Sequence, residues 1–295
     1  MAIALISGAE GFTGRYLAEE LALRGHTVAG IGLKSRPPNV LLDIYEQVDL
    51  LDADATAAAI SRIHPDIIFH LAGISHVQST PAIIYQVNII SSRNLLAALA
   101  KLETPPEFTM LASTANLYGN AGGIIDESTP PDPCNDYAVS KLAMEYMAKI
   151  WQNSFPITIV RPFNYTGCGQ QESFLIPKLV KHFRERIPVI ELGNTHVTRE
   201  FGDVRDIARI YTHLAENRAP WGPFNICTGK GYKLAHILDM LRELTGYSPE
   251  IRTNPAFIRP NEVDTLIGST KKLEECIGTI PCRGIEATLK WMLES

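Results

Sequence analysis

The feature that most constrains the fold stands at the N-terminus, where an apolar run leads directly into a glycine-rich turn. Residues 3–6 read as a short buried strand, and Gly8, Gly11 and Gly14 follow it with GxxGxxG spacing. A helical pattern over residues 15–24 comes next. Such glycines let the backbone approach a pyrophosphate, and the helix N-terminus stabilises its negative charge. This context predicts a dinucleotide-binding turn, although an ordinary tight strand–helix turn has the same spacing.

Further strand and helix patterns follow the turn. Apolar runs over residues 27–31, 66–69, 108–112 and 157–160 read as strands, and residues 85–102 read as a helix. Repeated strand–helix units predict an α/β fold with a Rossmann-type, doubly wound parallel sheet. In such sheets ligands collect at the carboxyl ends of the strands.

The end of the second strand bears on the choice of cofactor. An acid there would hold the adenosine ribose hydroxyls of NAD, but residues 32–36 (Gly-Leu-Lys-Ser-Arg) contain none. Lys34 and Arg36 could instead take a 2′-phosphate, which favours NADP(H) and leaves NAD(H) possible. The alternative is a solvated basic turn. Asp49 and Leu50, which end a further short segment, could reach the adenine.

Tyr137 and Lys141 are the candidates for the chemistry. In a helix predicted over residues 136–153, positions four apart share one face, so a phenol lies beside an ammonium group. A free tyrosine titrates near ~10, and a neighbouring positive charge lowers its pKa. The pair therefore suits a general acid that protonates a carbonyl oxygen. A surface Tyr and Lys at helical spacing is the alternative interpretation.

Four motifs together indicate a family. They are the glycine turn, residues 70–73 (His-Leu-Ala-Gly), residues 113–119 (Ser-Thr-Ala-Asn-Leu-Tyr-Gly) and the pair Tyr137 and Lys141. Over essentially its whole length the chain resembles the extended short-chain dehydrogenase/reductases, the nucleotide-sugar epimerase and dehydratase group. The resemblance implies that Thr114 hydrogen-bonds the reacting sugar oxygen, Tyr137 donates the proton, and Lys141 tunes it and holds the nicotinamide ribose. Ser113 is the competing hydroxyl. The expected cofactor contacts are Gly8, Gly11, Phe12, Thr13, Gly14, Lys34, Arg36, Asp49, Leu50, Leu71, Ala72, Gly73, Tyr137 and Lys141.

Motifs in the second half narrow the resemblance. Residues 161–170, 199–206 and 254–263 look like those of the GDP-4-keto-6-deoxy-mannose reductases. Asn116 stands where the related GDP-mannose 4,6-dehydratases place a glutamate, and an amide cannot take a proton from C5. Ile74 departs from the family pattern in the sugar pocket, so the configuration at C4 stays open. The expected substrate contacts are Ser75, Asn116, Asn164, Lys178, Arg199, Arg259 and Glu262.

The resemblance implies a reductase with two domains. We expect a dinucleotide-binding domain over residues 1–163, to which 201–226 return, and a mainly substrate-binding region over 164–295. The expected reaction is NAD(P)H-dependent reduction of the C4 keto group of a nucleotide-linked 4-keto-6-deoxy sugar, from GDP-4-keto-6-deoxy-D-mannose to GDP-D-rhamnose. GDP is favoured over dTDP or UDP. The family builds a homodimer from the helices predicted over residues 85–102 and 136–153. A 4-epimerase, a 4,6-dehydratase and a non-catalytic nucleotide-sensing protein are the alternatives.

The composition of the chain limits the kinds of binding partner and the cellular compartment that we expect. With a net charge of −5, the 295 residues give no reason to expect a nucleic acid or an anionic membrane as partner. No apolar run reaches the ~18 residues of a membrane span, and the first residues lack the basic segment of a signal peptide. The 5 cysteines are odd in number and show no CxxC spacing. We therefore expect a cytoplasmic protein without a disulfide frame or a metal site.

Overall fold

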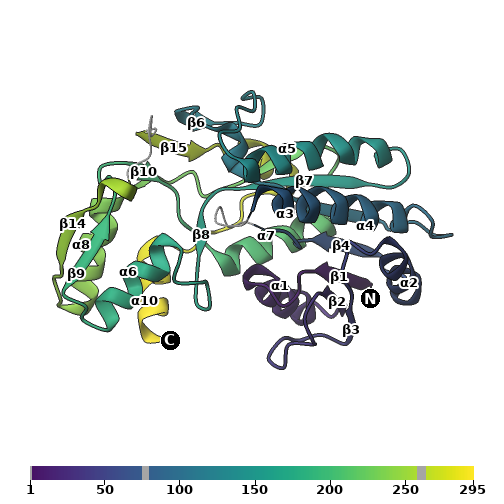
Figure 1. The fold of residues 1–295 in the computed structure, drawn as a ribbon, viewed down its shortest axis with the longest axis horizontal. Coiled ribbons are helices and arrows are strands. Elements are labelled where there is room, and N and C mark those ends of the chain that lie inside the picture. The colour runs from purple at the N-terminus through teal and green to yellow at the C-terminus, as the bar shows by residue number, and fades with distance from the viewer. Residues whose placement is uncertain (1, 75–79, 258–263) are drawn as a thin grey trace.

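The computed structural model describes residues 2–74, 80–257 and 264–295, with a seven-stranded sheet in one part of the molecule (Figure 1). Its strands lie in the order β12-β7-β5-β4-β1-β2-β3, and neighbouring strands are parallel. Their bounds are β1 (Ile3–Ser7), β2 (Thr27–Gly32), β3 (Ile44–Gln47), β4 (Ile67–His70), β5 (Phe108–Ala112), β7 (Ile157–Pro162) and β12 (Pro223–Ile226). This arrangement confirms the predicted Rossmann-type, doubly wound parallel sheet.

Helices bury both faces of this sheet, which explains why its strands read as continuous apolar runs. On β1, Ala4 and Ile6 belong to one apolar core, and Leu5 between them belongs to the other, because strand side chains alternate between faces. The first core includes residues of α1 (Phe12–Leu23) and α7 (Val204–Glu216). The second includes residues of α2 (Ala53–Ile63), α4 (Ser92–Leu99) and α5 (Asp136–Ala148).

The helix predicted over residues 85–102 is interrupted. The chain forms α3 (Pro81–Tyr85), then a π-helical turn over Gln86–Ser91 (η1), and only then α4. Such turns are rare and concentrate at functional sites. The helix predicted over 136–153 ends at Ala148 as α5, and a 3₁₀ turn (η3, Lys149–Trp151) follows it.

The second half builds a separate apolar core, which lies away from the large sheet in Figure 1. It contains side chains of α6 (Leu175–Arg184), α8 (Leu234–Thr245) and α10 (Ile285–Glu294). The smaller elements are β6 (Gly123–Ile125), β8 (Tyr165–Thr166), β9 (Val189–Leu192), β10 (Thr198–Arg199), β11 (Gly202–Asp203), β13 (Tyr232–Lys233), β14 (Glu250–Thr253), β15 (Thr265–Gly268), α9 (Lys271–Ile277) and the 3₁₀ turns η2 (Ala115–Tyr118) and η4 (Pro255–Phe257). Three smaller sheets have the orders β13-β10-β15-β6, β11-β8 and β14-β9.

The chain passes between the two parts more than once. Within residues 201–226, α7 and β12 belong to the large sheet and its first core. Leu273 of α9 also joins that core. The predicted domain bounds remain a prediction, and Leu273 suggests a second return of the chain to the first domain.

Two absences apply to the described part of the chain. None of its helices is both long and apolar enough to cross a membrane. Nor does it hold a group of three or more His, Cys, Asp or Glu side chains that could bind a metal ion. Its 5 cysteines are free thiols.

Candidate active site

The glycine turn is closely packed against the end of β4. Gly8 has φ +75°, and a Cβ there would lie 3.0 Å from the Ala72 nitrogen. A Cβ on Gly14 would lie 2.4 Å from the Gly8 carbonyl oxygen. The Ser7 carbonyl accepts a hydrogen bond from the Leu71 nitrogen (3.1 Å), which aligns the two segments. Glycine is therefore required at both positions, and the structure brings the predicted cofactor segments 8–14 and 71–73 together.

The start of α1 fits a pyrophosphate. Its N-cap is Gly11, and no side chain among the described residues caps this end. The first backbone N–H groups of the helix are therefore open to an external acceptor, and the helix dipole favours an anion there. This fit supports the predicted dinucleotide site.

Tyr165 joins the glycine turn to β8, a contact that the sequence did not predict. The Thr13 hydroxyl lies 2.7 Å from the Tyr165 hydroxyl. The Phe12 ring stacks on the Tyr165 ring with centroids 6.1 Å apart. The available signal was the position of Tyr165 directly after Asn164 in a family motif. Phe12 and Thr13 thus contact the second half of the chain as well as the turn.

The three predicted catalytic residues lie at the carboxyl end of β5. Tyr137 stands in the first turn of α5, which Asn135 caps by accepting from the Ala138 nitrogen (2.9 Å). The Thr114 hydroxyl lies near the Tyr137 phenol and lowers its pKa. Lys141 donates from Nζ to the Ala112 carbonyl oxygen at 2.8 Å. The structure thus brings Thr114, Tyr137 and Lys141 together, while their roles in catalysis remain predictions.

The predicted lowering of the Tyr137 pKa is wrong for this structure. Burial raises the Tyr137 pKa to about 12, and the nearby Thr114 hydroxyl opposes this only in part. Burial also lowers the pKa of Lys141, to about 8, against the opposing charge of Glu145. Desolvation disfavours the charged form of both groups. The four-residue spacing suggested that the Lys141 charge would set the pKa of Tyr137, whereas burial is the largest influence on it.

Ser113, the competing hydroxyl, serves a different contact. It donates to Glu145 Oε1 at 2.5 Å. Glu145 forms a buried ion pair with Arg161, whose Nη2 lies 2.7 Å from Oε2. Arg161 also donates to the Tyr118 hydroxyl at 2.9 Å. Ser113 is therefore engaged in a buried network, which leaves Thr114 as the hydroxyl beside Tyr137.

Asn88 is a second residue that the sequence did not single out. Its fully buried amide accepts from the Ile74 nitrogen (2.8 Å) and donates to the Ser140 hydroxyl (2.9 Å). A Cβ on Gly73 would lie 3.0 Å from Asn88 Oδ1 and 3.1 Å from Lys141 Nζ. Asn88 thus fixes residues 73 and 74 against α5. An amide inside an apolar helical pattern was the signal in the sequence.

His70 lies beneath the same edge of the sheet. Its Nδ1 is 2.6 Å from the Ser7 hydroxyl, and its Nε2 is 2.8 Å from the Ser92 hydroxyl. Burial, helped by the charge of Lys141, lowers its pKa to about 3. The imidazole is therefore neutral at physiological pH and ties β1 and β4 to α4.

The residues predicted to contact the adenosine differ in their exposure to solvent. Lys34 is exposed, and Arg36 donates to the Leu42 carbonyl. Asp49 is exposed and accepts from the Leu51 nitrogen (2.9 Å), whereas the Leu50 side chain is buried in the second core. Contact of Asp49 and Leu50 with adenine stays a prediction.

The predicted substrate contacts are only partly described. Lys178 donates to the Glu191 carbonyl oxygen (2.8 Å), and its ammonium lies 4.9 Å from the Phe257 ring centroid. Arg199 donates to the Thr198 carbonyl oxygen (2.9 Å). Asn116 and Asn164 have exposed side chains, and Asn116 donates from its backbone to Thr114 Oγ1 (3.1 Å). Ser75, Arg259 and Glu262 lie outside the described residues. Substrate binding by this set stays a prediction.

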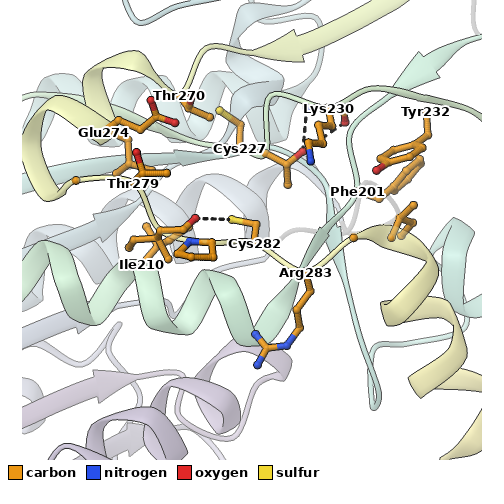
Figure 2. Close-up of a pocket in the computed structure, with 17 residues that line it drawn as sticks. Phe201, Ile210, Cys227, Lys230, Tyr232, Thr270, Glu274, Thr279, Cys282 and Arg283 are labelled. Carbon is orange, nitrogen blue, oxygen red and sulfur yellow. Dashed lines mark hydrogen bonds between the residues drawn. The ribbon is translucent and has the colours of Figure 1, made fainter.

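A cavity of about 330 Å³ lies elsewhere, where β12 ends near α7 and α9. Figure 2 shows Cys227, Thr270, Glu274 and Arg283 around it, with Cys282 hydrogen-bonded to a backbone carbonyl. None of the three predicted catalytic residues lines this cavity. It is therefore not the space in which the proposed chemistry would occur.

Known proteins resemble this chain over nearly its whole length. The model of the NAD dependent epimerase/dehydratase family matches residues 4–227. A GDP-6-deoxy-D-talose 4-dehydrogenase of Aggregatibacter actinomycetemcomitans is 34% identical, over 93% of this chain and 90% of the relative. A GDP-6-deoxy-D-mannose reductase of Pseudomonas aeruginosa is 30% identical, over 98% of this chain and 95% of the relative.

Solved structures are similar as well. The crystal structure of a candidate epimerase from Burkholderia cenocepacia has a TM-score of 0.95 and 44% identity, covering 99% of this chain and 97% of the other. The structure of RMD from Pseudomonas aeruginosa complexed with NADPH has a TM-score of 0.87 and 27% identity, covering 100% of this chain and 98% of the other.

Proposed function

Because the chain belongs to the NAD dependent epimerase/dehydratase family, as its motifs predicted, we propose that it reduces the C4 keto group of a nucleotide-linked 4-keto-6-deoxy sugar. The proposed substrate is GDP-4-keto-6-deoxy-D-mannose and the proposed product is GDP-D-rhamnose. Two relatives are named for GDP-linked 6-deoxyhexoses, which supports GDP over dTDP or UDP. The family and the fit of the glycine turn support a nicotinamide cofactor.

The observation that carries this proposal is the contact between Thr114 and Tyr137 at the carboxyl end of β5. With its pKa raised to about 12, Tyr137 holds its proton at neutral pH, as an acid for a carbonyl oxygen must. Thr114 can orient the same oxygen. Both groups come from packed elements, so the proton donor is positioned before the substrate arrives.

Each residue of the site has one step in the proposed reaction. When bound, the reduced nicotinamide supplies the hydride for C4. Tyr137 gives its phenolic proton to the C4 oxygen, and Thr114 donates a hydrogen bond to that oxygen. Lys141 stabilises the phenolate that remains. Asn88 holds residue 74 against Ser140 of α5, the helix that carries Tyr137 and Lys141.

Asn116 argues against the 4,6-dehydratase alternative. It stands in η2, two residues after Thr114, where the resemblance expects a glutamate in a dehydratase. Elimination requires a base for the C5 proton, and an amide does not accept protons at neutral pH. Reduction requires no such base, so Asn116 is compatible with the proposed reaction.

A second product is supported by one specific relative. 6-Deoxy-D-talose is the C4 epimer of 6-deoxy-D-mannose, which is D-rhamnose. A relative that is 34% identical to this chain is named for GDP-6-deoxy-D-talose. GDP-6-deoxy-D-talose is therefore the alternative product, formed if the sugar presents its other face to the cofactor.

The test is turnover of GDP-4-keto-6-deoxy-D-mannose with NADH and with NADPH, followed by NMR of the product. Tyr137→Phe keeps the ring but removes the proton, so turnover should fall about 10²–10⁴-fold. Thr114→Val should reduce turnover by less than Tyr137→Phe does, because it removes one orienting hydrogen bond and not the proton source. Near-full turnover by Tyr137→Phe, or consumption of GDP-mannose by the wild type, would refute the proposal. Tightly bound NAD with no net cofactor use would favour the epimerase, and the coupling constants at H4 would separate the two products.

We also propose that the protein is a homodimer. Large apolar side chains are exposed on α3, η1, α5 and η3, namely Ile83, Ile90, Val139, Tyr146 and Ile150. Burial against a second copy would remove this surface from water. Of these elements, η1, α5 and η3 fall within residues 85–102 and 136–153, the helices that the family resemblance assigns to the interface.

A further inference from the structure

Glu10, inside the glycine turn, reaches the end of β2. Gly32 is the last residue of β2, and a Cβ on it would lie 2.2 Å from Glu10 Oε2 and 2.5 Å from Oε1. The carboxylate therefore lies against the Gly32 backbone. The sequence of β2 ends without an acid, yet the fold places one at that position from a different segment.

One oxygen of this carboxylate has no partner. Glu10 Oε2 is inaccessible to solvent and accepts no hydrogen bond from residues 2–74, 80–257 or 264–295. The nearby phenol of Tyr45, whose pKa burial and Glu10 both raise, donates instead to the Lys34 carbonyl oxygen at 2.6 Å. A buried acceptor without a donor is costly, so a rotation of the Glu10 side chain that lets the carboxylate accept from a ligand hydroxyl would be stabilising.

The cations near this position do not neutralise Glu10. Arg15 donates from Nε to the backbone carbonyl of Glu10 at 3.3 Å, not to its carboxylate. Arg36 donates to the Leu42 carbonyl, and Lys34 has an exposed side chain. Within the described ranges, no Lys or Arg forms an ion pair with the Glu10 carboxylate. Its negative charge therefore acts on whatever binds beside the end of β2.

We propose that Glu10 makes the protein select NAD(H) over NADP(H). An acid at the end of the second strand hydrogen-bonds the adenosine ribose 2′-hydroxyl, and the Glu10 carboxylate occupies that place. A 2′-phosphate carries about two negative charges and would meet the carboxylate with repulsion. The inference reverses the expectation drawn from Lys34 and Arg36. It rests on the dinucleotide site of the proposed function but not on the identity of the sugar.

The test measures binding without any sugar substrate. Titration calorimetry of the wild-type protein should show NADH binding about 10- to 100-fold more tightly than NADPH, the range expected for one charged hydrogen bond gained or lost. Glu10→Gln keeps the size of the side chain and removes its charge. It should bring the two affinities to within a few-fold, mainly because NADPH binds more tightly. Gly32→Ala retains the charge but displaces the carboxylate, and it should also reduce the preference.

Matched variants separate this mechanism from its rivals. Glu19→Gln removes a carboxylate from an exposed position on α1 and should leave the preference unchanged. If the basic turn binds a 2′-phosphate instead, the wild type should bind NADPH more tightly than NADH. Lys34→Gln should then weaken the binding of NADPH but not that of NADH. Either result overturns the proposal. An unchanged ratio in a folded Glu10→Gln protein, checked by circular dichroism, also overturns it. Absence of binding by both dinucleotides would refute the selectivity together with the cofactor site. If NADH binds selectively but the sugar is not reduced, the proposed reaction is rejected and the proposed cofactor selectivity stands.

Discussion

His70 should make the protein lose stability in mild acid. Its side chain is 1% exposed, and both ring nitrogens face hydroxyl groups, those of Ser7 and Ser92. Burial, and secondarily the charge of Lys141, lowers its pKa to about 3 from the ordinary value of 6.5. Between these two values the unfolded chain binds a proton that the folded protein does not. Folding stability contributed by His70 therefore falls as the pH decreases below about 6.5.

The magnitude follows from the two pKa values. At pH 5 the unfolded histidine is almost fully protonated, 1.5 units below its ordinary pKa, while the folded histidine stays neutral. At about 1.4 kcal/mol per pKa unit, the free energy of unfolding should fall by about 2 kcal/mol between pH 7 and pH 5 from this group alone. Below pH 3 the loss should level off, because both states then bind the proton.

Urea unfolding at pH 7 and pH 5 measures this loss. Other groups titrate in the same interval, so the quantity to compare is the difference between variants. His70→Asn removes the titration and keeps a polar group, and it should be less sensitive to acid than the wild type by about 2 kcal/mol. His64→Asn is the matched control at an exposed position with φ +49°, a conformation that Asn tolerates. Equal loss in the wild type and His70→Asn would contradict the burial argument.

Two further predictions concern packing and assembly. Arg161→Met should lower the free energy of unfolding by about 3–5 kcal/mol, because it leaves Glu145 buried without its charged partner. The control Arg62→Met breaks an exposed ion pair and should change the free energy of unfolding by less than about 1 kcal/mol. Equal effects of the two substitutions in urea unfolding would contradict this prediction. Light scattering at micromolar concentration should give the mass of a dimer, and Ile150→Glu, which places a charge on an exposed apolar side chain of η3, should give that of a monomer. A wild-type monomer would refute the proposed interface.

The parts of the fold predicted well are those encoded by short segments. The strand–turn–helix at the N-terminus follows from apolar residues and glycine spacing within about 20 positions, and the structure has β1 and α1 there. Gly14 is explained by backbone contacts with Gly8 and Ala9 within the same turn. Tyr137 and Lys141 share a helix face because of the helical repeat alone. Local periodicity was sufficient for each of these features.

Features that depend on distant segments were not predicted. Glu10 meets Gly32 because β1 and β2 are neighbours, and their register decides where the glycine turn ends. Asn88, which fixes residues 73 and 74, lies in the π-helical turn that interrupts the expected helix. The Thr13–Tyr165 contact joins residues 152 positions apart. No spacing in the sequence encodes these contacts, since each depends on how separate elements pack.

Burial was the other quantity that the sequence concealed, and it bears on the direction of the proposed reaction. The pair Tyr137 and Lys141 indicated a lowered phenol pKa, whereas the buried phenol has a pKa raised to about 12. At pH 7 the phenolate is then about one molecule in 10⁵, against about one in 10³ for a free tyrosine. Oxidation of an alcohol needs the phenolate as base, while reduction of a ketone needs the protonated phenol. Burial of Tyr137 therefore keeps the phenol protonated at neutral pH, which is the form that reduction of a ketone consumes.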